Sequence, residues 1–204
     1  LFGVASESQS AEEMIGLSKR KNSIVNLTGK TDLKQLADLL KGCAYLITND
    51  TGTMHLAAAL KTKIIGLFFA HAHPFETAPF SSGHLIFQAR IPCAPCSYGV
   101  HCNNIVCIEK VLPEHILSFI ENYEHYDSWK LPFDLKNSQE VNIYETLTSS
   151  QGIVRLKPMI KHEININDIF RLAYAVLWRE ILDEELKTSL EDIQEWLEEY
   201  NYDD

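Results

Sequence analysis

The chain has 204 residues, of which 46% are hydrophobic and 23% charged, as expected for one good core with at most a small appendage. The net charge of −10 argues against a general nucleic-acid binder, because such proteins need a basic surface to displace counterions. Residues 139–204 hold 6 Lys or Arg against 15 Asp or Glu, so the acidity belongs to the C-terminal part. The longest apolar run, Ile64 to Ala70, is too short for a membrane span.

The start of the chain shows no charged segment followed by an apolar run, so we predict no signal peptide. The first residue is not Met, and Leu1 to Val4 is typical of the middle of a strand. We therefore expect this sequence to be part of a longer protein, trimmed at its N-terminus.

Short apolar runs alternate with helical patterns along residues 1–70, which predicts βαβ units with right-handed crossovers. The predicted strands are Leu1–Val4, Ser23–Leu27, Tyr45–Thr48 and Lys63–Phe69. The predicted helices run from Ser8 or Ser10 as cap to Arg20, from Thr31 as cap to Leu40, and from Met54 to Leu60. The fold class is therefore α/β, with a Rossmann-like doubly wound parallel sheet.

The alternation of apolar runs and helical patterns becomes irregular after Phe69, so the elements of the later part of the chain are predicted one by one. We expect a loop over His71–Gly83, a strand over His84–Ala89 and a helix from Pro113 to Tyr123. Two closing helices are expected over Asp168–Leu182 and Leu190–Tyr200. The predicted domains are a binding domain over 1–123, a linker over 124–152 and an acidic helical extension over 153–204.

The closing helices carry apolar stripes that include Leu177, Trp178 and Ile181. One interpretation is a helical hairpin packed on the α/β body, with its charges in water. The other is a docking surface for a partner protein.

The turn Asn49–Thr53, after the third predicted strand, is the main candidate for a ligand site, since α/β sheets bind ligands beyond the carboxyl ends of their strands. Gly52 allows a phosphate to approach the backbone, and the N–H groups of the next helical turn attract anions. Thr51 and Thr53 add hydroxyl donors. These features predict a phosphate site.

Two further side chains extend this candidate site beyond phosphate binding. Asp50 repels phosphate, so its carboxylate is better suited to accept hydrogen bonds from sugar hydroxyls. His55 could lie beside a phosphate or a sugar hydroxyl. A nucleotide-linked sugar would use both kinds of group, although a plain N-cap with a structural histidine is the simpler interpretation.

Two runs carry a family resemblance: Asn26–Leu40, which contains L-T-G-K-T, and Tyr45–Ala59, which contains D-T-G-x-x-H. Together they resemble the donor half of glycosyltransferase family 9, the heptosyltransferase-like family of lipopolysaccharide assembly. The similarity continues through Cys93–Cys96 and ends near residue 122. It implies a GT-B architecture, in which two Rossmann-like domains face each other across a cleft. The implied reaction transfers the sugar with inversion of configuration at its anomeric carbon and needs no catalytic metal.

The resemblance assigns roles to residues that match the family motifs. Asp50 would hold sugar hydroxyls, Thr51, Gly52 and Thr53 would bind the pyrophosphate, and His55 would lie beside them. Glu7 would contact the ribose, and Lys30 and Thr31 would line the same edge. Phe69 departs from the family, which usually has a glycine there at the phosphate approach.

The resemblance also implies partners that this chain does not itself supply. The donor would be a nucleotide-activated sugar, ADP-heptose in the best-known members, and the acceptor a sugar or glycan. No catalytic residue is expected in this chain, since the general base belongs to the N-terminal acceptor domain of the family. The implied location is cytoplasmic and peripheral at the inner membrane face.

Four cysteines, Cys93, Cys96, Cys102 and Cys107, have the spacing C-x2-C-x5-C-x4-C. The first pair suits a corner of a structural zinc site, and nearby histidines at 71, 73 and 101 could replace a ligand. Disulfides and free thiols remain alternatives. No cofactor is expected for catalysis.

Three hypotheses about function follow. The first is the donor-binding half of a sugar transferase acting on a cell-envelope or protein glycan. The second is a non-catalytic Rossmann-like module that docks a partner through its acidic tail. The third is a structural adaptor that depends on zinc at the four cysteines.

Overall fold

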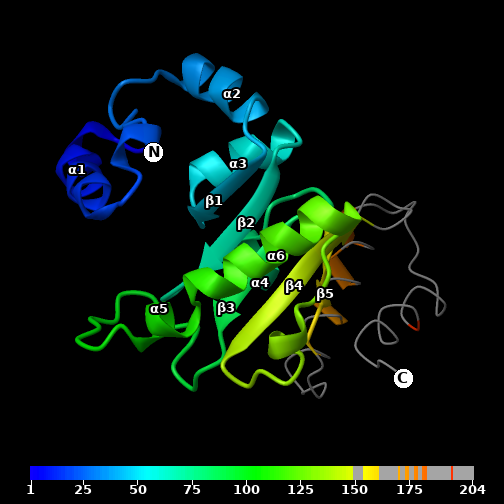
Figure 1. Ribbon diagram of the computed structural model, residues 1–204. Helices are drawn as coiled ribbons and strands as arrows, with labels where there is room; N and C mark the ends of the chain where they lie inside the picture. Colours follow the sequence, from blue (N-terminus) through cyan, green and yellow to red (C-terminus); the bar gives the residue numbers. More distant parts are fainter. Residues whose placement is uncertain are drawn as a thin grey trace.

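A five-stranded sheet organises the chain, with the strand order β1-β2-β3-β4-β5 (Figure 1). The computed structural model describes residues 1–148, 154–160, 170, 173–174, 177–178, 181–182 and 194. The strands are β1 (Tyr45–Asn49), β2 (Lys63–Phe68), β3 (Leu85–Ala89), β4 (Val141–Thr148) and β5 (Val154–Pro158). The predicted α/β fold with a Rossmann-like sheet is confirmed.

The first three strands run parallel, as the alternating pattern predicts. Ile47 of β1 lies opposite Ile65 of β2, and Ile65 lies opposite Leu85 of β3. Helix α3 (Gly52–Ala59) makes the crossover from β1 to β2, and the short helix α4 (Pro74–Thr77) lies between β2 and β3. The strands expected at 45–48, 63–69 and 84–89 are therefore all present.

The other two strands are antiparallel, so the sheet is mixed rather than wholly parallel. β4 pairs with β3, with Phe87 opposite Ile143, and β5 pairs with β4. The linker expected over 124–152 is wrong in this respect, because the stretch contains β4 and the 3-10 turn η3 (Phe133–Leu135). Polar residues interrupt the apolar alternation of β4, which made the strand resemble a loop in the sequence. The division into domains itself stays a prediction.

Helices cover both faces of the sheet, which is the doubly wound arrangement. Helix α6 (Pro113–Tyr126) packs Phe119 on one face, against a cluster that includes Phe87 and Ile143. Helix α3 packs Met54 on the other face, with Leu40 of α2 (Leu33–Lys41), in a cluster that includes Phe68 and Tyr144. Each face thus buries its own apolar core.

The N-terminal segment differs from its prediction. Residues 1–4 and 23–27 are not strands, although their backbones are joined by bonds such as Leu1 N to Val25 O at 2.7 Å and Leu27 N to Leu1 O at 2.9 Å. The short 3-10 turns η1 (Ala5–Glu7) and η2 (Lys21–Ser23) flank helix α1. Three bonds hold two extended segments together without completing a ladder.

Helix α1 (Ser8–Leu17) ends three residues before the predicted Arg20 and is not capped by a serine side chain. The apolar side chains of Met14 and Leu17 on this helix are exposed. Helix α2 is capped by Asp32 and not by Thr31: Asp32 accepts from Gln35 N at 2.8 Å, and Gln35 accepts from Asp32 N. The Asp32 carboxylate caps the helix in place of the Thr31 hydroxyl because Asp32 and Gln35 complete a reciprocal capping box.

Most of the C-terminal extension lies outside the described residues, including about half of the helix expected over 168–182 and all but Gln194 of the helix expected over 190–200; the described positions in both ranges are helical. Its beginning is a strand, β5, and not a helix. Leu177, Trp178 and Ile181 are about half exposed, and whether the extension packs on the α/β body or docks a partner stays a prediction. Within the described part of the chain, every helix is too short or too polar to cross a membrane.

A buried histidine, His84, joins three elements at the amino end of β3. Its Nδ1 accepts from Ile64 N at 3.2 Å, its backbone N–H donates to Thr146 Oγ1 at 2.9 Å, and its Nε2 lies 2.6 Å from Ser81 Oγ. Because Nδ1 is an acceptor, the neutral ring carries its proton on Nε2. Burial lowers the pKa of His84 to about 4, so protonation would be resisted in the folded chain.

We expect His84 to make the folded state less stable as the pH falls. Above pH 6.5 the histidine is neutral in both states, whereas between pH 6.5 and about 4 only the unfolded chain takes up the proton. The free energy of unfolding should fall by up to about 3 kcal/mol more over this window in the wild type than in His84→Asn. Urea unfolding at pH 7.5, 6.5, 5.5 and 4.5 measures this difference, and parallel curves for the two proteins would contradict it.

Candidate functional site

The turn between β1 and α3 places the predicted phosphate-binding residues at the carboxyl edge of the parallel strands. Thr51 is the N-cap of α3 in position, but its side chain makes no capping hydrogen bond to the helix. Its hydroxyl lies 3.4 Å from that of Thr48. The first N–H groups of α3 are therefore not closed off by a side-chain cap, and they keep their capacity to bind an anion.

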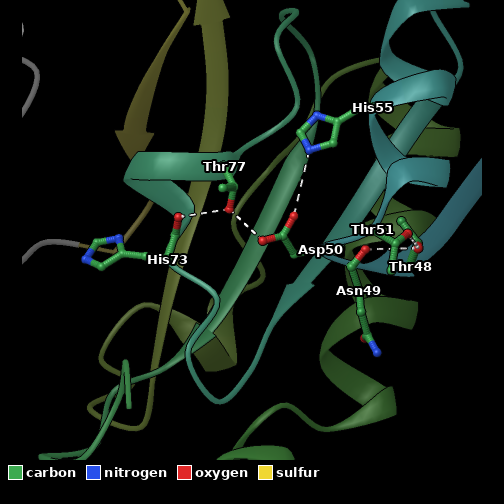
Figure 2. A network of polar contacts seen from close by, with 7 residues as sticks. All are labelled: Thr48, Asn49, Asp50, Thr51, His55, His73 and Thr77. Carbon is green, nitrogen blue, oxygen red and sulfur yellow. Dashed lines mark hydrogen bonds and ion pairs between the residues drawn. The ribbon is translucent and has the colours of Figure 1, made fainter. Parts of the chain in front are cut away.

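The Asp50 carboxylate does not cap the helix either, because it is engaged on both sides by other side chains (Figure 2). Thr77 Oγ1 donates to Asp50 Oδ2 at 2.6 Å. His55 Nε2, on α3, lies 3.8 Å from Asp50 Oδ1. Asp50 thus stands between α3 and α4, with about a fifth of its side chain exposed (21%). Asp50 is therefore held by side-chain contacts from α3 and α4 and does not act as a helix cap.

Helix α4 brings Thr77 to Asp50. His73 begins the helix, since its Nδ1 accepts from Phe75 N at 3.3 Å, and Pro74 is buried at the first position. The Phe75 ring packs edge-on against Tyr144 of β4, with the ring centroids 5.3 Å apart. The antiparallel strand β4 thereby supports the helix that carries Thr77.

A cleft of about 320 Å³ opens beside Asp50. Its lining residues are Asp50, His71, Ala72, His73, Glu76, Thr77, Pro95, Cys96 and Tyr98. Two segments meet there: the loop with α4, and the cysteine segment, which is tied on by a bond from Cys96 N to Ala70 O at 2.8 Å. The rings of His71 and Tyr98 pack edge to face, with their centroids 5.2 Å apart.

Several of these cleft residues were missed in the sequence. His71 and His73 were considered only as zinc ligands, and Glu76, Thr77 and Tyr98 were not considered at all. A proline after His73 and a carboxylate at Glu76 are start signals for a short helix. No local pattern pointed to Thr77, because its contact with Asp50 joins residues 27 positions apart.

The remaining predicted donor-binding residues lie in the N-terminal segment and make local contacts. The Glu7 carboxylate accepts from Val4 N at 2.8 Å, and Lys30 Nζ donates to Asn26 O at 3.0 Å. Thr31 is half-buried before α2. The contacts of Glu7 and Lys30 reach only their own segment of the described chain, so the donor-binding roles of all three residues stay predictions.

Phe69, the departure from the family motif, packs in the core on the face away from α3. Its side chain packs with the cluster on the face covered by α6, together with Ile65 and Phe87. Helix α3 and the apolar residues that it buries belong to the cluster on the opposite face. The bulky ring that replaces the usual glycine is therefore accommodated in the core on the face away from α3.

The cysteine segment includes helix α5 (Val106–Lys110) and contains free thiols only. Partial burial and the neighbouring Cys93, Cys102 and Cys107 raise the pKa of the Cys96 thiol. Among the described residues, no three of the side chains that bind metals are grouped closely enough for one ion. Zinc at these four cysteines stays a prediction, which metal analysis of the purified chain would test.

Comparison with known proteins gives a family and several relatives. The model of glycosyltransferase family 9 (heptosyltransferase) matches residues 1–104. Lipooligosaccharide heptosyltransferase 2 of Haemophilus ducreyi is 36% identical over 43% of this chain and 26% of its own length. The enzyme of that name from Campylobacter jejuni serotype O:2 is 28% identical over 60% of this chain and 39% of its own length.

Lipopolysaccharide heptosyltransferase 2 of Escherichia coli K12 is 34% identical over 40% of this chain and 24% of its own length. This chain therefore matches well under half the length of each of these relatives. No solved structure matches it.

The glycines of the two motifs should respond differently to an added methyl group. Gly29 has φ +67°, and a Cβ there would lie 2.7 Å from the backbone of Ala5, whereas a Cβ on Gly52 would meet nothing within 4 Å. Gly29→Ala should lower the free energy of unfolding by about 1–3 kcal/mol, and Gly52→Ala should change it by less than about 0.5 kcal/mol. Urea unfolding measures both, and equal losses would contradict this distinction.

Proposed function

The chain belongs to glycosyltransferase family 9, and on this premise we propose that it is the donor-binding part of a glycosyltransferase. The donor would be ADP-heptose or a related nucleotide-activated sugar, and the acceptor a cell-envelope glycan such as the lipopolysaccharide core. The observation that carries the proposal is the Asp50 carboxylate, held by Thr77 and His55 beside the uncapped start of α3.

The start of α3 is the part of the site that suits the diphosphate. Its free N–H groups, the open space at Gly52 and the hydroxyls of Thr51 and Thr53 would bind the negative oxygens. The same groups would stabilise the nucleotide diphosphate as it leaves, since preorganised donors act most strongly on charge that develops in the transition state. This is the contribution of the chain to catalysis.

The cleft beside Asp50 suits the sugar. Asp50 and Glu76 contribute two carboxylates, and neither Lys nor Arg is among the described residues that line it. Carboxylates repel phosphate but accept hydrogen bonds from hydroxyl groups. We therefore place the sugar in the cleft and the diphosphate on α3, with Asp50 at the boundary between them.

The acceptor and the general base belong to the rest of the protein in this proposal. In the family's two-domain arrangement, an N-terminal domain would bind the acceptor and remove a proton from its hydroxyl, which then displaces the nucleotide diphosphate with inversion. The proposed reaction needs no metal. The proposed location is the cytoplasm, at the inner face of the membrane where such glycans are assembled.

Titration calorimetry of the chain with ADP, UDP and GDP, without added metal, tests this proposal. We expect one nucleotide, ADP first, to bind selectively, and Gly52→Val to weaken it at least about tenfold because the side chain fills the approach to α3. Asp50→Ala should weaken binding of the nucleotide-sugar more than binding of the nucleotide alone, since the Asp50 carboxylate is assigned to the sugar.

Gly16→Val is the matched control, because a Cβ at this exposed glycine of α1 also meets nothing within 4 Å. It should bind the nucleotide as the wild type does. Failure of all three nucleotides to bind would overturn the proposal and favour the non-catalytic module, whose partner would dock on the C-terminal extension.

A further inference from the structure

A hydrogen bond from Thr77 joins α4 to the Asp50 carboxylate, the candidate sugar-binding group (Figure 2). We propose that Thr77 is a positioning residue: its hydroxyl orients the Asp50 carboxylate so that the free lone pairs of that group face the sugar of the donor. The inference rests on the proposed function and adds to it a residue that determines preference for the sugar.

The hydroxyl proton of Thr77 can be assigned from the distances. Thr77 Oγ1 lies 2.6 Å from Asp50 Oδ2 and 3.3 Å from His73 O, and both neighbours are acceptors. A hydroxyl has a single proton, and 2.6 Å is typical of a bond from a hydroxyl to a carboxylate. The proton therefore lies toward Asp50, and the contact with His73 is the weaker one.

The carboxylate keeps binding capacity after this bond is made. Its two oxygens offer about four acceptor positions, of which Thr77 uses one on Oδ2. His55 approaches the other oxygen only to 3.8 Å, beyond a normal hydrogen bond. Asp50 can thus accept from sugar hydroxyls without releasing Thr77, and its orientation is fixed before the ligand arrives.

The helix that carries Thr77 is itself held in place. Pro74 is buried, and Phe75 packs edge-on against Tyr144 at 5.3 Å. Because α4 has a single turn, these contacts also fix where the hydroxyl of Thr77 lies. A preorganised carboxylate binds the sugar more tightly because little conformational entropy is lost when the complex forms.

The test compares ADP-heptose with ADP as probes, by titration calorimetry on the full chain. We expect Thr77→Val to weaken ADP-heptose about tenfold, as for the loss of a hydrogen bond to a charged group, and to change the affinity for ADP less than about twofold. Thr77→Ser keeps the hydroxyl and should restore most of the affinity for the sugar nucleotide. In an Asp50→Ala background, Thr77→Val should cause no further loss.

Thr62→Val is the matched control, since it removes a buried hydroxyl that donates to Leu40 O at 2.9 Å just before β2 begins, at the opposite end of that strand. It should leave the ratio of the two affinities unchanged. Equal weakening of both probes by Thr77→Val would overturn the inference, because Thr77 would then maintain the site as a whole.

The inference also fails if Thr77→Val binds ADP-heptose as the wild type does. If Asp50→Ala still weakens ADP-heptose in that case, the proposed function stands without it. A wild-type chain that binds neither probe overturns the proposed function and this inference together.

Discussion

The parallel register of β1 and β2 brings the two elements that hold Asp50 to the same edge of the sheet. Asn49 pairs with Leu67, so the turn after β1 and the loop after β2 leave the sheet at the same edge. Asp50 then meets Thr77 although 27 residues separate them in the chain. The start of α3 and the short helix α4 come together only because the two strands end side by side.

The parallel half of the fold and the position of its binding turn could be predicted, because their signals are local. Tyr45–Asn49, Gly52–Ala59 and Lys63–Phe68 are short, mainly apolar segments bounded by polar or turn residues, and a small turn with Asp50 falls between the first two. β4 could not be predicted, since its strand character depends on pairing with β3 across some fifty residues. The prediction of strands at the N-terminus was wrong for a related reason. Apolar residues favour a strand, but a ladder also requires a neighbouring strand to pair with.

The candidate site divides in the same way. Gly52 and Thr51 belong to a motif that a reader of the sequence can find, and the structure leaves the helix start next to them uncapped. Thr77, Glu76 and Tyr98 join the site through tertiary contacts, so their own neighbours in the chain carry no sign of it. The motif thus indicates the proposed anion-binding part and Asp50, whereas the other residues of the proposed sugar-binding cleft required three-dimensional information.

The family match ends at residue 104, but residues beyond that position also support the candidate site. Tyr144 belongs to β4, beyond that boundary, and its ring steadies the helix that carries Thr77. Helix α4 therefore packs on a residue beyond the part of the chain that the family model matches. Substitutions at Tyr144 would act on the proposed sugar-binding carboxylate through α4, so the proposed sugar preference can change while the motif residues around Asp50 stay the same.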